Sequence, residues 1–189
     1  LAPYYINQLS VIENIAKSLP INFKLVVKEH PQMLGFRPLS FYKKLKKINN
    51  VDIIHPQFDN FEIIKKAKLI FTITGTSAFE GVLLKKPVIT LGSVIFNRCS
   101  LVTNASNISP INWGKLIFDK LKYYKHDEKI MFEYMNFIFS NSHRFNFIEP
   151  LANLDSVLAK NNVESIIKML EIETKRIKLY KNYGLPKII

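Results

Sequence analysis

The sequence predicts an α/β protein, in which a parallel β-sheet is flanked by helices and followed by a helical C-terminal extension. Three observations predict this fold class. Short apolar runs rich in β-branched residues alternate with short amphipathic segments over the first hundred residues, as in repeated βα units. The apolar runs are nearly continuous, as in strands that are covered on both faces. After about residue 100 the strand-like runs give way to helical patterns.

The individual elements follow from these patterns in chain order. An amphipathic helix is expected over residues 5–19, and Pro20 ends it. Strands are expected at 23–27, 51–54, 69–73 and 87–91, with helices between them at 38–47, 60–66 and 77–84. Later helices are expected at 112–124, 127–139 and 162–180, and a connecting loop at 141–154.

The organisation into domains follows the same change of pattern. We expect an α/β core over residues 1–105 and a helical continuation over residues 106–189 that packs on the same domain. The large aromatic side chains of the continuation are expected in the core and not as a stacking platform: Trp113, Tyr134 and Phe137.

Cysteine and histidine content argues against a disulfide or a metal site. Cys99 is the only cysteine, so no disulfide can form within the chain. No set of histidines and cysteines has the spacing of zinc ligands, and His126 and His143 are expected at the surface. We therefore expect neither a metal nor another cofactor.

Targeting signals are also absent from the sequence. No segment approaches 18 uncharged apolar residues, and the start of the chain has no signal-peptide pattern. We expect a cytoplasmic protein and leave peripheral contact with the inner membrane open. The chain begins at Leu1 without an initiator methionine, so we expect it to be part of a longer polypeptide.

The charge balance favours an anionic partner. The chain has 27 basic and 15 acidic residues, a net charge of +12, and most of the excess lies in the first hundred residues. Such a field attracts nucleotides, phosphate, nucleic acid or an anionic membrane surface. Aromatic residues are not interleaved with Lys and Arg as in nucleic-acid binders, so that partner is not expected.

Polar, turn-forming stretches follow four of the expected strands. Ligands of parallel α/β sheets bind beyond the carboxyl ends of the strands, and the topology should bring these ends to one rim. The stretches are Glu29-His30-Pro31, His55-Pro56-Gln57, Thr74-Gly75-Thr76-Ser77 and Gly92-Ser93.

The third of these stretches opens a helix and is suited to phosphate. Helix N-termini present free N–H groups and bind anions. Gly75 lets the backbone approach a ligand closely, Thr76 and Ser77 add hydroxyl donors, and Glu80 could accept from ribose hydroxyls. A second interpretation stays open, because Ser77-x-x-Glu80 is also a capping box that only closes the helix.

The first stretch carries a histidine held by a following proline. His30 could donate to a phosphate or act as an acid or base, since an imidazole ring can either donate or accept a proton, and Lys28 adds positive charge beside Glu29 and Pro31. A loop histidine bonded only to the backbone is the alternative. His55-Pro56 repeats the pattern but looks more like a strand-ending turn.

Together these segments resemble the capsule polysaccharide biosynthesis family, whose members are bacterial glycosyltransferases of the two-lobed GT-B type, including Kdo transferases. The resemblance covers roughly residues 5–105. The segments that carry it are Lys28–Pro31, Asn50–His55, Ala67–Ile73, Thr74–Glu80 and Lys86–Gly92. The His-Pro element with a downstream hydroxyl-rich helix start is also similar to bacterial sialyltransferases, which use CMP-linked donors.

The resemblance implies a Rossmann-like C-terminal donor lobe and a role for each matching residue. His30 would contact the donor phosphate, and Pro31 would shape its loop. Thr76 and Ser77 would bind phosphate, and Glu80 would hold the ribose. The donor would be CMP-Kdo-like or, next, a UDP-sugar, and the acceptor would be a glycan.

Two departures from the family pattern matter. The family commonly has Glu-Ala after the phosphate turn, whereas this chain has Glu80-Gly81, which weakens the helix but would permit close packing. A GT-B enzyme also needs an acceptor lobe before this segment, so we expect such a lobe in the same polypeptide, and the catalytic residues remain unassigned. Phe96 lies where the family often has an aromatic residue.

Two alternatives to a glycosyltransferase lobe are considered. UDP-sugar 2-epimerases and glycerophosphotransferases have similar lobes, but an epimerase should show more acid/base residues at the rim than Glu29, Asp59 and Glu80. The other alternative is a non-catalytic nucleotide-binding domain. The sequence leaves open the sugar, the acceptor, the stereochemistry and the oligomeric state.

Overall fold

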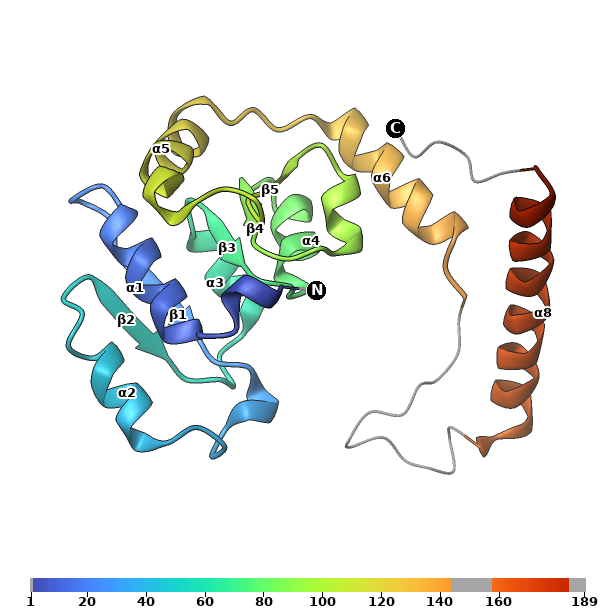
Figure 1. Cartoon of the computed structure of the whole chain (residues 1–189), viewed down its shortest axis with the longest axis horizontal. Coiled ribbons are helices and arrows are strands. Elements are labelled where there is room, and N and C mark those ends of the chain that lie inside the picture. Colours follow the sequence, from blue (N-terminus) through green and yellow to red (C-terminus); the bar gives the residue numbers. More distant parts are fainter. Residues whose placement is uncertain (1, 144–157, 184–189) are drawn as a thin grey trace. The chain divides into compact units, whose positions relative to one another are not determined.

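The computed structural model describes residues 2–143 and 158–183, and these belong to two compact units, Leu1–Met135 and Asn136–Ile189 (Figure 1). The first unit contains the strands of the described chain, in two parallel sheets. The second contains the end of α6 (Glu128–Ser140) and the whole of α8 (Lys160–Tyr183).

The first sheet pairs β1 (Leu25–Lys28) with β2 (Val51–Ile54) in parallel, with Leu25 opposite Val51. Before it lies α1 (Gln8–Ser18), which begins where the Asn7 side chain accepts a hydrogen bond from the Ser10 N–H at 3.2 Å. A short helix, α2 (Leu39–Leu45), joins the two strands. This is one βαβ unit, the connection expected of parallel strands.

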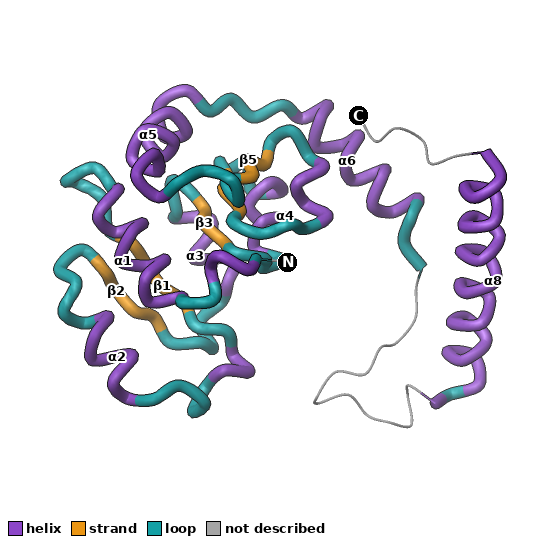
Figure 2. Tube along the Cα trace, in the orientation of Figure 1, coloured by secondary structure: helices purple, strands orange, loops and turns teal. Residues whose placement is uncertain are grey.

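The second sheet has the order β3-β4-β5, from Ile70–Thr72, Val88–Thr90 and Val102–Asn104 (Figure 2). All three residues of the central strand β4 are buried, because it has a neighbour on each edge and cover on both faces. The helices that precede and follow β3 are α3 (Asn60–Lys66) and α4 (Ser77–Leu83).

Helix α4 packs closely on β3 and β4 because Gly81 has no side chain. A Cβ atom at this position would lie 2.7 Å from Val88 Cγ2 and 3.2 Å from Ile70 Cγ1. The first distance is shorter than carbon atoms tolerate, and the second would require Ile70 to shift slightly. The glycine that departs from the family pattern therefore has a packing role, and the close approach expected of it is confirmed.

A cluster around the buried Trp113 forms the main core between α1, β4 and α5 (Trp113–Tyr123). The Trp113 indole N–H donates to the Ile108 carbonyl at 3.1 Å, which satisfies its one polar atom. Tyr5 and Phe71 contact the indole ring, with ring centroids 5.9 and 5.5 Å away. Trp113 and Tyr134 are buried as predicted, and Phe137 is half-buried.

The predicted fold class is confirmed, since the described chain is α/β with short parallel sheets, flanking helices and a C-terminal helix. β2 and α3 begin and end at the predicted residues, and most other elements deviate by one to three residues at an end. Two features differ. The strands form two separate sheets, and β5 lies between residues 92 and 111, where neither a strand nor a helix was predicted. Part of the expected 141–154 loop lies outside the described residues, and the domain boundary at residue 105 stays a prediction.

Candidate functional site

A cavity of about 1040 Å³ opens between the two sheets of the first unit. Residues of β1 and β3 line it, and its walls continue onto α1 and α3. At the carboxyl ends of β1 and β3 it is lined by the residues that the sequence singled out: Lys28, Glu29, His30, Pro31, Thr74, Gly75, Thr76 and Ser77. Two strand ends that are more than 40 residues apart along the chain therefore share one cavity.

His30 is exposed at this end of the cavity, at the start of the 3-10 helix Pro31–Met33. Its Nδ1 atom accepts a hydrogen bond from the Gln32 N–H at 3.3 Å. An accepting Nδ1 carries no proton, so the proton of the neutral ring is on Nε2. Pro31 at the first helical position favours this turn, because its ring fixes the φ angle. His30 thus offers an Nε2–H donor to a ligand.

Glu29 lines the cavity, but its carboxylate is bound by the protein's own side chains. Oε2 accepts from the Arg37 Nε–H and from the Tyr42 hydroxyl at 3.4 Å. The side chains of Glu29 and Arg37 are only 11% and 17% exposed, and the Arg37 guanidinium lies 4.6 Å from the centroid of the Phe41 ring. The geometry gives Glu29 the role of holding the His30 loop, whereas a direct ligand contact of Glu29 stays untested.

The turn after β3 is held by a hydrogen bond from the Gly75 N–H to Thr72 Oγ1 at 3.0 Å. A Cβ atom on Gly75 would lie 2.8 Å from the same Thr72 oxygen, so this turn requires glycine. Gly75 and Thr76 are exposed and Ser77 is half-buried. Ser77 is the first residue of α4, so its hydroxyl lies at the predicted helix start.

The Glu80 carboxylate does not close a capping box with Ser77. Thr76 is the N-cap residue of α4, and its side chain makes no hydrogen bond to the helix backbone. Instead, Glu80 Oε2 accepts from the amide group of Asn60, and Glu80 Oε1 lies 3.5 Å from the Thr76 hydroxyl. Glu80 is not among the cavity-lining residues, whereas Asn60 is. The sequence offered no signal for Asn60, because the contact depends on how α3 and α4 pack.

The lining of the cavity is positively charged. Its acidic residue is Glu29, which is paired with Arg37. Its basic residues are four lysines: Lys24, Lys28, Lys66 and Lys68. Lys24 is neutralised in part by Asp52 at 3.1 Å, and both side chains are more than half exposed. A concave surface with excess positive charge concentrates anionic ligands. The cavity is therefore electrostatically suited to a phosphate-containing molecule.

The other two predicted stretches, His55–Gln57 and Gly92–Ser93, are not in the lining, although Ile54 and Phe58 on either side of the first of them are. His55 repeats the local geometry of His30, since its Nδ1 accepts from the Gln57 N–H at 3.3 Å, but His55 is absent from the lining. Phe96, beyond Gly92, stacks on Phe79 with ring centroids 6.2 Å apart. Of the four predicted polar stretches, two line the cavity.

A group of titratable side chains lies away from the cavity, around the buried Cys99. Burial raises the pKa of the Cys99 thiol and raises the pKa of Tyr134 to about 12.

His126 was expected at the surface, but its Nε2 is buried and has no hydrogen-bond partner among the described residues. The expectation is wrong for this atom, because the ring packs beside Tyr124 with its Nδ1 3.2 Å from the hydroxyl. His143 is half-buried and lies 3.1 Å from Glu173.

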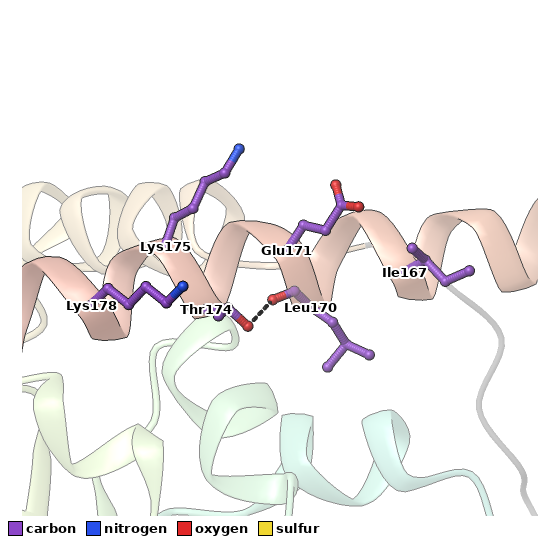
Figure 3. Close-up of a pocket in the computed structure, with 6 residues that line it drawn as sticks. All are labelled: Ile167, Leu170, Glu171, Thr174, Lys175 and Lys178. Carbon is purple, nitrogen blue, oxygen red and sulfur yellow. Dashed lines mark hydrogen bonds between the residues drawn. The ribbon is translucent and has the colours of Figure 1, made fainter.

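The second unit has a shallow depression of about 360 Å³ on α8 (Figure 3). The Thr174 hydroxyl there donates to the Leu170 carbonyl of the same helix at 2.7 Å, Lys175 points away from the helix, and Lys178 lies along it. The depression lies along a single helix and contains none of the predicted site residues: it is lined by Ile167, Leu170, Glu171, Thr174, Lys175 and Lys178.

The described residues provide neither a membrane-spanning helix nor a metal-binding cluster. None of the described helices is both long enough and apolar enough to cross a bilayer. Within residues 2–143 and 158–183 there is also no group of three or more His, Cys, Asp or Glu side chains that could hold a metal ion.

Comparison with known proteins gives one match. A family model described as "Capsule polysaccharide biosynthesis protein" matches residues 6–134, which include every residue that lines the cavity. No curated protein and no solved structure matches the chain. The matched segment also extends through α5 into α6, beyond the part in which the resemblance was seen. The chain therefore belongs to the capsule polysaccharide biosynthesis protein family, which indicates a role in surface polysaccharide synthesis.

Proposed function

We propose that the first unit is the nucleotide-sugar-binding lobe of a bacterial GT-B glycosyltransferase in capsule or other surface polysaccharide biosynthesis. The donor that we favour is CMP-Kdo-like, with a UDP-sugar next, and the acceptor is a glycan. The single observation that carries this proposal is the shared cavity. It collects the His30 loop and the Ser77 turn in one positively charged, concave site within the segment that defines the family.

The proposed chemistry is stabilisation of the leaving nucleotide. The donor phosphate would be met by the Nε2–H of His30, the hydroxyls of Thr76 and Ser77 and the charge of Lys28. As the glycosidic bond to the phosphate breaks, negative charge grows on the phosphate oxygens, and preorganised donors stabilise it. Hydrogen bonds to a charged acceptor are about twice as strong as neutral ones, so each of these donors matters.

The acidic residues of the rim favour the transferase over an epimerase. Glu29 is paired with Arg37, and Glu80 is bound by Asn60. Asp59 caps α3, since its Oδ1 accepts from the Phe61 N–H at 2.8 Å. All three have structural partners within the chain, and none is left as an unengaged acid or base.

Other partners are also proposed. The excess positive charge of the chain suits peripheral contact with an anionic membrane surface, where a growing surface polysaccharide and its acceptor would be met. A non-catalytic nucleotide-binding domain would use the same cavity without transferring sugar. Release of CMP from CMP-Kdo in the presence of a glycan acceptor separates the transferase from this alternative.

The binding proposal is tested by titration calorimetry with CMP and UMP. His30→Ala and Ser77→Ala should each weaken binding by about tenfold or more, because each removes a hydrogen bond to a charged group. His55→Ala is the matched control, since His55 has the same local hydrogen bond outside the cavity, and its affinity should equal that of the wild type. Equal affinities for all four proteins would reject the site.

A further inference from the structure

Asn60 links two parts of the proposed site that lie far apart in the sequence. It is the first residue of α3, and the capping of this helix is done by the preceding Asp59. The Asn60 side chain is therefore not used at its own helix end. Its amide group instead donates to Glu80 Oε2 on α4, 20 residues further along the chain.

This contact fixes the orientation of the Glu80 carboxylate. One oxygen is held by Asn60, and the other lies 3.5 Å from the Thr76 hydroxyl. An ionised carboxylate only accepts hydrogen bonds, and each oxygen has two lone pairs. Each oxygen of Glu80 therefore keeps capacity for a further donor while its direction is set by the protein.

Asn60 also faces the site directly. It lines the cavity that contains His30 and Ser77, and its amide is only part-buried where it meets Glu80. No hydrogen bond within the described chain uses its Oδ1 atom, and Oδ1 is not among the buried polar atoms that lack a partner. The amide oxygen is thus a solvent-accessible acceptor beside the Glu80 carboxylate.

We infer that Asn60 is a specificity-determining residue, whose amide group is held by Glu80 and whose amide oxygen accepts from a sugar hydroxyl of the bound nucleotide. The inference rests on the proposed function. This acceptor in the cavity matches the 2′-hydroxyl of a ribose, which has one O–H to donate. A 2′-deoxyribose leaves one acceptor unpaired, and sites built to bind a hydroxyl reject the analogue that lacks it.

The test compares CMP with dCMP, and UMP with dUMP, by titration calorimetry. The wild-type chain should bind the ribonucleotide about tenfold more tightly than the deoxyribonucleotide, the effect of one unpaired polar group. In Asn60→Ala this ratio should fall to about twofold or less. Asn60→Asp keeps the size and the oxygen but loses the amide donor and repels Glu80, so its ratio should fall as well.

A matched control and a folding check separate this role from a purely structural one. Glu62→Gln changes another residue in the first turn of α3, where Glu62 is paired with Lys65 at 2.7 Å, and its ratio should equal that of the wild type. Thermal melting followed by circular dichroism shows which variants fold. If Asn60 only ties α3 to α4, the melting temperature of Asn60→Ala falls while the ratio is unchanged.

The outcomes for Asn60 and for the proposed function are distinguishable. A folded Asn60→Ala or Asn60→Asp variant with an unchanged ratio overturns the role of Asn60 and leaves the cavity proposal intact. The same holds for a wild-type chain that binds CMP and dCMP equally. A wild-type chain that binds neither CMP nor UMP overturns the proposed function and the role of Asn60 together.

Discussion

Gly81 shows how one residue sets the distance between a helix and a sheet. A glycine inside a helix costs about 1 kcal/mol relative to alanine, so its presence in the buried part of α4 needs a reason. The reason is space, because a Cβ atom would lie 2.7 Å from Val88 Cγ2. Val88 is fully buried in the central strand, and its β-branched side chain has little freedom to move.

Gly81→Ala should therefore destabilise the protein although alanine is the better helix former. Overpacking costs typically 1–3 kcal/mol, which exceeds the gain in helix propensity, so we expect the free energy of unfolding to fall by about 1 kcal/mol in urea denaturation. Gly114→Ala in α5 is the control, since its nearest contact would be 3.6 Å, and it should lose no stability. A more stable Gly81→Ala variant would contradict the packing role.

Tyr134 predicts a pH dependence of stability. Burial, with a smaller contribution from Cys99, raises the pKa of Tyr134 to about 12, above the value near 10 of an unfolded chain. The folded state holds the phenol proton more tightly, so this stabilisation is complete below about pH 10 and is lost as the pH rises through about 12. Tyr134→Phe has no phenol to ionise, and its free energy of unfolding should fall less steeply over that window.

Urea denaturation at several pH values checks this prediction. Near pH 7 the variant should lose about 1 kcal/mol, because the Tyr134 hydroxyl donates to the Ile95 carbonyl at 3.3 Å. Tyr123→Phe, which changes a side chain that is 62% exposed, should keep the wild-type slope. A Tyr134→Phe slope equal to that of Tyr123→Phe would show that the buried phenol does not carry the effect.

At the scale of elements, the Glu29–Arg37 pair connects the end of β1 to the start of α2. Arg37→Met would leave the Glu29 carboxylate, which is 11% exposed, without its charged partner. An unpaired, largely buried charge costs about 1–3 kcal/mol or more, so we expect a clear loss of stability in urea denaturation.

The exposed pair between Lys24 and Asp52 provides the contrast. Its side chains are 65% and 53% exposed, and such pairs contribute about 0–1 kcal/mol, so Lys24→Met should change stability little. The double variant Arg37→Met/Glu29→Gln should recover part of the loss, since it removes the unpaired charge. If Arg37→Met and Lys24→Met changed the free energy of unfolding equally, the Glu29–Arg37 pair would not have the stabilising role given to it.

The elements also show which structure local sequence can predict. Val51–Ile54 is marked by β-branched residues at three of its four positions, and Asn60–Lys66 by an acidic helix start, and both were predicted at their observed bounds. β5 has three residues, like β3 and β4, but Asn104 interrupts its apolar run, and it exists because it pairs with β4. The partners of Glu29 and Glu80 depend on packing between elements, so no local sequence pattern predicts their contacts with Arg37 and Asn60.

At the scale of the whole molecule, the cavity belongs entirely to the first unit. All of its lining residues lie before Met135, and the family match ends at residue 134. A chain that ends at Ser142 should therefore fold and bind CMP with an affinity within about twofold of the full chain, since distant changes are nearly independent. Thermal shift with CMP checks this, and a folded, truncated chain that no longer binds CMP would place part of the site in the second unit.

The most direct test of the central claim is a crystal structure of the chain with bound CMP. The account predicts a phosphate within hydrogen-bond distance, about 2.7–3.2 Å, of both His30 Nε2 and Ser77 Oγ. A phosphate that contacts only one of these two loops, or that binds at Lys175 and Lys178 on α8, would contradict it.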